Sequence, residues 1–160
     1  MKSSQHLKNL LEQWESLSQE VYLDTGARPT IGIGHLLTQS ERSSGKITIG
    51  DQVLKFSDWL SVDQCRKLLE QDLKVPEQTV NGLVFAELNQ NQFDALVSFT
   101  YNLGAEAFKN STLLKMLNAG LYSQVPGQLR RWVHDSGKVV QGLVNRREKE
   151  IALWNEVPHA

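Results

Sequence analysis

The chain has 160 residues, of which 40% are hydrophobic and 22% are charged, a length and balance typical of one globular domain. Its formal net charge of −1 excludes a global electrostatic attraction to nucleic acid or to anionic membranes. A single cysteine excludes an internal disulfide, and the four histidines do not have the spacing of metal ligands, so we expect no metal site.

The N-terminal stretch, MKSSQHLKNLLEQWES, contains no long apolar run, so we expect neither a cleavable signal peptide nor a membrane anchor. The protein would then be made in the cytoplasm and would need another device to carry it elsewhere. Within residues 5–18, leucines and Trp14 recur at spacings of three and four, which predicts an amphipathic helix. Ser3 or Ser4 is placed to cap it.

This helical period stops at residues 22–37, YLDTGARPTIGIGHLL, which contain three glycines and a proline. Such a composition predicts a small twisted hairpin. A second hairpin is predicted over residues 46–56, KITIGDQVLKF, with Gly50 and Asp51 as its turn. We therefore expect a β-rich lobe over about residues 20–58.

The remainder of the chain reads as helical. Ser61 and Gln64 form a capping-box pattern before a helix over residues 62–73, in which Cys65 is predicted to be a small core residue. Residues 89–104 are apolar on most faces, which predicts a buried central helix. Three more helices are predicted over residues 110–120, 124–134 and 142–155. One late cluster of cations is the candidate for a local basic patch: Arg130, Arg131, Arg146, Arg147 and Lys149.

Two acidic residues flank the glycine-rich segment. Glu15 lies near the end of the first predicted helix beside the apolar Trp14, and Asp24 lies at the entry to the hairpin, where water reaches it. Two carboxyl groups in unequal environments are the working parts of glycoside hydrolysis, and the hydroxyl of Thr30 is placed to hold a water. The residues alone also permit a plainer interpretation, in which Asp24 forms a turn and Glu15 is a solvated helix residue.

The segment WESLSQEVYLDTGARPTIGIGHLLT resembles the active-site segment of the phage-type lysozymes, the family of the T-even phage muramidase. That family has a glutamate, an aspartate and a threonine in the pattern E-x8-D-x5-T, which Glu15, Asp24 and Thr30 match, and the run TIGIGH matches too. QNQFDALVSFTYNLG is similar to the family's central helix, FKNSTLL to its cleft-side helix start and GLVNRREKEIALW to its C-terminal helix. The resemblance covers most of the chain.

The resemblance implies an α+β, lysozyme-like fold with a small β-hairpin lobe and a larger helical lobe (residues 1–19 and 60–160) around an active-site cleft, all in one catalytic domain over residues 1–160. It implies a peptidoglycan hydrolase that cleaves the β-1,4 bond between N-acetylmuramic acid and N-acetylglucosamine. Glu15 would be the general acid at the junction of the lobes. The hairpin would place Asp24 and Thr30 across the cleft, where they position a water for single displacement with inversion. No cofactor is implied.

Three further positions take supporting roles from the resemblance. His35 matches a histidine that pairs with an acid on the next helix, here Asp72, in a structural pair that ties the two lobes. Arg146 matches an arginine that contacts the catalytic glutamate, although it also fits a surface residue of the basic cluster. Ser16 departs from the glycine that often follows the glutamate, which is tolerated unless the position needs a positive φ.

Substrate contacts are implied at four positions. Leu36, Tyr101 and Ser111 match cleft-lining positions of the family, and Asn102 is close enough in sequence to reach the same cleft. Each has a structural alternative: Leu36 in the core, Tyr101 packed within the central helix, and Ser111 as a helix cap. The segment SERSSGKITIGDQVLKFSDWL differs from the T-even protein, which leaves the rim of the β-rich lobe outside the resemblance.

The sequence also permits two other functions, a lytic transglycosylase and a wall-binding module. A lytic transglycosylase of the same fold typically needs a glutamate alone, so Asp24 and Thr30 favour hydrolysis, and a wall-binding module would not need the three residues at this spacing. The biological role fits a phage endolysin released through a holin pore, or an antibacterial effector that a secretion system exports. We expect a monomer whose partner is the peptidoglycan glycan strand, with no nucleic acid and no membrane anchor.

Overall fold

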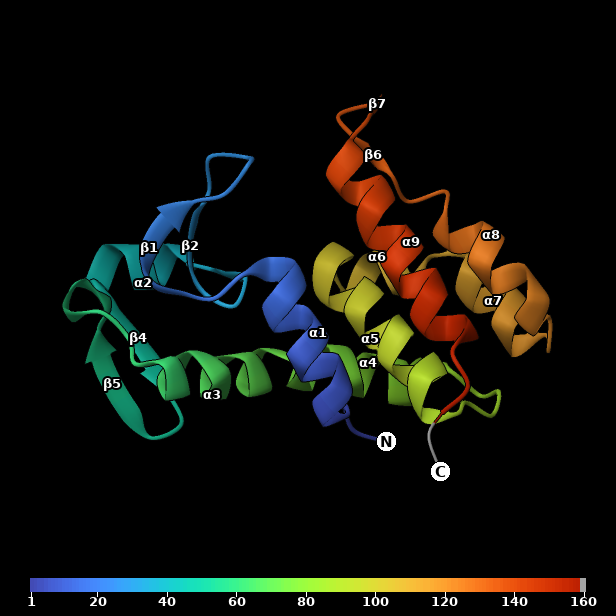
Figure 1. The fold of residues 1–160 in the computed structure, drawn as a ribbon, viewed down its shortest axis with the longest axis horizontal. Helices are drawn as coiled ribbons and strands as arrows, with labels where there is room; N and C mark the ends of the chain where they lie inside the picture. The colour runs from blue at the N-terminus through green and yellow to red at the C-terminus, as the bar shows by residue number, and fades with distance from the viewer. Residues whose placement is uncertain (159–160) are drawn as a thin grey trace. The chain divides into compact units, whose positions relative to one another are not determined.

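In the computed structural model, residues 1–158 are described, and the chain forms two compact units (Figure 1). The N-terminal unit is Lys8–Lys74, and the C-terminal unit comprises Met1–Leu7 and the chain from Val75 onward. Helix α1 (Gln5–Glu15) begins in the C-terminal unit and ends in the N-terminal unit. Small sheets in a mainly helical chain make the class α+β, as predicted. In the described part of the chain, no helix is long and apolar enough to cross a bilayer.

The N-terminal unit contains both predicted hairpins. A three-stranded antiparallel sheet has the order β1 (Ser18–Leu23), β2 (Pro29–Gly32) and β3 (His35–Leu36). The second hairpin is β4 (Lys46–Ile49) with β5 (Gln52–Lys55), joined by the predicted turn. Its Gly50 has a φ of 64°, the left-handed conformation that such a turn requires. The unit is completed by α2 (Gln39–Ser44), the 3₁₀ turn η1 (Phe56–Asp58) and α3 (Val62–Asp72).

The core of the N-terminal unit lies between the strands and α3, which Figure 1 shows in green on one side of the strands. Cys65 and Leu68 of α3 pack with Ile31 of β2 and with Ile47 and Ile49 of β4. Cys65 is fully buried, so the predicted small core residue is confirmed. The compact unit therefore extends beyond the expected β-rich stretch, because a helix supplies one side of its core.

The C-terminal unit is helical and is built around α5 (Gln90–Leu103), whose middle is buried on every face. An Asn89 capping box begins this helix and Gly104, with a φ of 95°, ends it, so the predicted central helix is confirmed. Helix α9 (Gln141–Asn155) packs along α5. The other elements are α4 (Lys74–Leu83), α6 (Ala105–Lys109), α7 (Thr112–Asn118), η2 (Tyr122–Gln124), α8 (Val125–Leu129), β6 (His134–Asp135) and β7 (Lys138–Val139).

Several element boundaries differ from the sequence prediction. Helix α1 ends at Glu15 instead of residue 18, because Ser16 has a φ of 64°. The helix expected over 124–134 ends at Leu129, and the chain then turns through the small β6–β7 hairpin at Ser136, whose φ is 51°. A positive φ at a residue other than glycine is uncommon, so the sequence gives little warning of such breaks.

Candidate active site

Glu15 is the last residue of α1 and is half-buried. The left-handed Ser16 ends the helix and turns the chain into β1, so Glu15 stands at the helix terminus beside the sheet. Gly34, in the turn between β2 and β3, lies directly against the Glu15 side chain. A Cβ atom at Gly34 would lie 2.8 Å from Oε2 of Glu15, closer than real Cβ contacts allow, and 3.0 Å from Cδ, which is tighter than most.

Asp24 follows β1 and is held by a set of donors from its own turn. Its Oδ1 accepts hydrogen bonds from the backbone N–H groups of Gly26 and Arg28, each at 2.9 Å. Its Oδ2 accepts from the Arg28 guanidinium, with Nε at 3.1 Å. The Arg28 backbone N–H, together with the Arg28 side chain and the Gly26 N–H, lowers the pKa of Asp24 below its usual range. Asp24 is therefore ionised, as predicted, but the cause is this ring of donors more than its exposure to water.

Thr30 lies on β2 and is buried, with 2% of its surface exposed. Its hydroxyl donates a hydrogen bond of 2.9 Å to the Arg28 carbonyl, which leaves the hydroxyl oxygen as an acceptor. Arg28 thus contacts both Asp24 and Thr30, so the three residues form one polar turn. This turn brings together two of the three residues of the predicted catalytic pattern.

Tyr22 connects this turn with Glu15. It is the direct cross-strand partner of Thr30. Burial raises the pKa of the Tyr22 phenol, and the negative charges of Glu15 and then Asp24 add to that increase. Both carboxyl groups therefore lie near this one half-buried phenol. Tyr22 was not among the predicted site residues, and its place two residues before Asp24 is the only signal of its role in the sequence.

His35 is held between two carboxylates. Its Nδ1 lies 2.7 Å from Oδ2 of Asp72, the predicted partner, and its Nε2 lies 2.9 Å from Oε1 of Glu41, which was not predicted. Burial alone would lower the pKa of His35, but the hydrogen bonds and charges of Asp72 and Glu41 outweigh it and raise the pKa to about 9. All three residues belong to the N-terminal unit, where this group ties β3 to α2 and α3. The pair of His35 and Asp72 thus joins the predicted β-rich stretch to the helix that follows it.

The predicted substrate-contact residues differ in their surroundings. Leu36 is 44% exposed, so the alternative that places it in the core is wrong. Tyr101 is half-buried on α5, and the neighbouring Asn102 accepts a hydrogen bond from the Arg147 guanidinium. Ser111 is buried and caps α7, since its hydroxyl accepts from the Leu114 N–H and donates to the Phe108 carbonyl. This geometry supports the cap and gives no support to a substrate role for Ser111.

Arg146 belongs to a buried charged group in the C-terminal unit. Only 7% of it is exposed, and its Nε lies 3.2 Å from both Glu150 Oε2 and Ser98 Oγ. Arg147 is fully buried and its Nε lies 2.6 Å from Glu150 Oε1. Arg130 is exposed but paired with Glu148, whereas Arg131 and Lys149 are exposed. Three of the five residues of the predicted basic patch are therefore buried or paired.

The described residues contain no group of three or more histidine, cysteine, aspartate or glutamate side chains placed to hold a metal ion. One of the four histidines, His159, lies outside the described residues.

A family model described as phage lysozyme matches residues 12–150 of this sequence. The chain belongs to the phage lysozyme family. Within this family it is 38% identical to an endolysin of Bacillus phage PZA, over 97% of the chain and 55% of that protein. It is 34% identical to an endolysin of Salmonella phage P22, over 90% of the chain and 91% of that protein. The chain spans about half the length of the first curated relatives it matches.

Solved phage lysozymes and related domains have the same fold. A mutant lysozyme of phage P22 superposes with a TM-score of 0.77 at 30% identity, covering 98% of this chain and 99% of that one. The muramidase domain of SpmX from Asticaccaulis excentricus superposes with a TM-score of 0.76, also at 30% identity and with the same coverage of both chains. The expected lysozyme-like fold is thereby confirmed.

Proposed function

We propose that this phage lysozyme is a muramidase, which hydrolyses the β-1,4 bond between N-acetylmuramic acid and N-acetylglucosamine in peptidoglycan. The observation that carries the proposal is the unequal environment of the two carboxyl groups. The donors of the polar turn keep Asp24 ionised, whereas Glu15 lies at a helix end against the Gly34 backbone. Glycoside hydrolysis requires one carboxylate that stays ionised and a second carboxyl group, in a different environment, that acts as the acid.

In this mechanism Glu15 gives its proton to the glycosidic oxygen as the bond breaks. Asp24 and the acceptor oxygen of Thr30 hold a water on the other face of the sugar, and Asp24 takes its proton as the water attacks C1. Because water attacks directly, the anomeric configuration is inverted and no glycosyl-enzyme forms. Arg28 acts through Asp24, since its guanidinium and N–H fix both carboxylate oxygens.

Leu36, Tyr101 and Asn102 remain the proposed glycan contacts. The exposed Leu36 side chain comes from β3, and its Cα is the register partner of Thr30 on β2. An apolar side chain at that position can cover the flat face of a sugar ring next to the reacting bond. Asn102 keeps its amide N–H groups for a ligand, because its contact with Arg147 uses only the carbonyl oxygen.

We propose cell-wall lysis as the biological role, with the protein reaching the wall by way of another component such as a pore or a secretion device. Relatives from several phages are named endolysins, which favours lysis of a host cell over the role of an antibacterial effector. A lytic transglycosylase is the alternative chemistry. Asp24 is held ionised and can therefore activate a water, which favours hydrolysis. A transglycosylase closes a 1,6-anhydro ring and does not need to activate a water.

The test is mass spectrometry of the products released from purified sacculi by the wild-type protein and by Glu15→Gln. We expect the wild type to release muropeptides with reducing ends, and Glu15→Gln to release at least about a thousandfold less, because an essential acid is lost. Glu12→Gln is the matched control, since Glu12 lies one turn earlier on α1 and pairs with Arg66. It should keep most of the activity.

Each result of this experiment has a distinct meaning. Anhydro products from the wild type would assign the protein to the transglycosylases and leave Asp24 and Thr30 without a role in activating water. An active Glu15→Gln variant would remove Glu15 from the mechanism. If no products form with the wild type, a binding function replaces the hydrolase, and sedimentation with sacculi tests it.

A further inference from the structure

Gly34 lies so close to the Glu15 side chain that a Cβ atom at this position would collide with it. The mechanism proposed above gives this contact no role. An added Cβ would meet three atoms of Glu15 at once, with Oε2 at 2.8 Å, Cδ at 3.0 Å and Cγ at 3.1 Å. Contacts below 3.0 Å force one partner to move. The flat backbone of Gly34 therefore lies along the length of the Glu15 side chain and touches its carboxyl end. Among the glycines of the described residues, Gly26 comes next, with a Cβ that would lie 3.4 Å from Oδ1 of Asp24, which is ordinary van der Waals contact.

The Gly34 backbone is itself held from both sides. Ile33 is buried, with 1% of its surface exposed, and so anchors the turn in the core. His35 is fixed by its contacts with Asp72 at 2.7 Å and Glu41 at 2.9 Å. A residue between two such anchors cannot retreat without breaking one of them. Any strain from a side chain at position 34 would therefore fall on Glu15.

We propose that Gly34 is a positioning residue for Glu15, a role that rests on the proposed function of Glu15 as the general acid. The backbone of the turn between β2 and β3 restricts the Glu15 carboxyl group to one orientation. In that orientation the carboxyl group points its proton at the glycosidic oxygen. A general acid must lie within hydrogen-bond reach of the atom that it protonates, and displacements of about 1 Å cost about 100-fold in rate. Gly34 acts through Glu15 and does not touch the substrate in this scheme.

Gly32 provides a matched control two residues away. Its φ of 68° is close to the 72° of Gly34, so an alanine at either position has a similar backbone strain. A Cβ at Gly32 would meet its nearest atom, Cδ2 of Leu68, at 3.4 Å, which is ordinary van der Waals contact. The difference between Gly34→Ala and Gly32→Ala thus isolates the collision with Glu15 from the strain in the backbone.

The first measurement is thermal unfolding and does not depend on activity. Gly32→Ala and Gly34→Ala should both lower the Tm, and Gly34→Ala should lower it further, by about 2–4 °C more. In a Glu15→Ala background the side chain that collides is gone, so this excess should disappear. An excess that persists without the Glu15 side chain would overturn the contact on which the proposal stands.

The second measurement is kinetic, on purified sacculi. We expect Gly34→Ala to lower kcat by about 100-fold with little change in KM, and Gly32→Ala to keep kcat within about threefold of the wild type. Equal kcat values for the two variants would overturn the positioning role even if the thermal result holds. A wild-type protein that releases no products would overturn the proposed function itself, while the unfolding data would still decide the contact.

Discussion

At the scale of single residues, Ser16 shows where the chain accepts strain. Its φ of 64° places a residue with a Cβ in the left-handed region, which costs about 1 kcal/mol. The position follows Glu15 directly, and it is where the family often has glycine. A serine is tolerated here without strain only where φ is negative, and the observed positive φ shows that the position is strained.

Ser16→Gly should therefore raise the free energy of unfolding by about 1 kcal/mol, because glycine adopts this φ without a penalty. Thermal unfolding followed by circular dichroism would show this as a Tm higher by about 2–4 °C. Ser43→Gly is the matched control. Ser43 is exposed within α2, where glycine weakens a helix, so this change should lower the Tm.

The two serines are expected to respond with opposite signs, which separates backbone strain from a general effect of removing a hydroxyl group. If Ser16→Gly lowers the Tm as Ser43→Gly does, then the Ser16 side chain makes a stabilising contact larger than its strain. Helix α1 would then end at Glu15 for a reason other than the backbone conformation of residue 16.

The residues of the candidate site differ in how far the sequence could reveal them. Glu15, Asp24 and Thr30 became distinctive only through the family pattern, since acids nine residues apart are common on protein surfaces. Tyr22 and Gly34 take their importance from neighbours in space. No local pattern reports that a glycine backbone lies against a carboxyl group, or that a phenol lies near two of them.

At the scale of elements, His35 joins three of them within the N-terminal unit: β3 carries the imidazole, α3 carries Asp72 and α2 carries Glu41. Its folded-state pKa is about 9, above the value of about 6.5 expected in the unfolded chain. A raised pKa on a base means that the folded state binds the proton more tightly. The resulting stability is fully present below pH 6.5 and is lost as the pH rises to about 9.

This shift predicts that the protein loses at most about 3 kcal/mol of unfolding free energy between pH 6 and pH 9.5. Urea unfolding at a series of pH values would measure the loss. His35→Asn should give a protein that is less stable at pH 6 and whose stability changes much less over this range. His6→Gln, at a half-exposed histidine of the C-terminal unit, should keep the wild-type slope.

A wild-type protein whose stability stays constant from pH 6 to pH 9.5 would show that folding does not change the pKa of His35. A stability that rises over this range would show that the folded state holds the imidazole neutral. Either result would contradict a charged His35 between Asp72 and Glu41.

The elements that sequence reasoning predicted well are those that carry a long repeat or an explicit end signal. The apolar run of α5 lies between Asn89 and Gly104, and both ends were predicted within one or two residues. Helix α2 has six residues and buries none of them, so its sequence has no amphipathic period. Neither the β6–β7 hairpin nor helix α4 was predicted. The hairpin has only two residues in each strand, and α4 has Pro76 within its first turn, which weakens the sequence signal for a helix.

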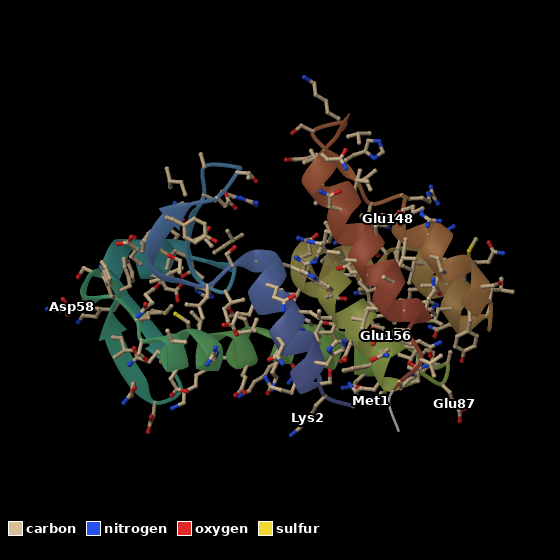
Figure 2. The ribbon with its side chains drawn as sticks, in the orientation of Figure 1. Met1, Lys2, Asp58, Glu87, Glu148 and Glu156 are labelled. Carbon is tan, nitrogen blue, oxygen red and sulfur yellow. The ribbon has the colours of Figure 1, made fainter. Side chains whose placement is uncertain are left out.

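At the scale of the whole molecule, the distribution of charge determines how the protein meets an anionic cell wall. The net charge is −1, and the two arginines with the deepest burial, Arg146 and Arg147, share Glu150 inside the C-terminal unit. Arg130 is paired with Glu148, with Nε 2.8 Å from Oε1. Figure 2 labels Glu148 on α9. Burial and pairing thus account for three of the five cations that the sequence had grouped, and with a net charge of −1 long-range attraction to a polyanion is weak.

Salt therefore should have little effect on activity, because screening weakens only interactions between exposed charges. Clearing of purified sacculi should change by no more than about threefold between about 20 and 200 mM salt, a range over which the Debye length falls from roughly 20 to 7 Å. Glu148→Lys is the contrasting variant. It frees Arg130, adds a cation beside it and raises the net charge by two, so its activity should be higher at low salt and should fall as salt is added.

A steep loss of activity with added salt for the wild type would mean that its exposed lysines act together as a binding surface despite the negative net charge. An unchanged salt profile for Glu148→Lys would place the wall-binding face away from this part of α9, because a charge acts on its substrate only within about a Debye length.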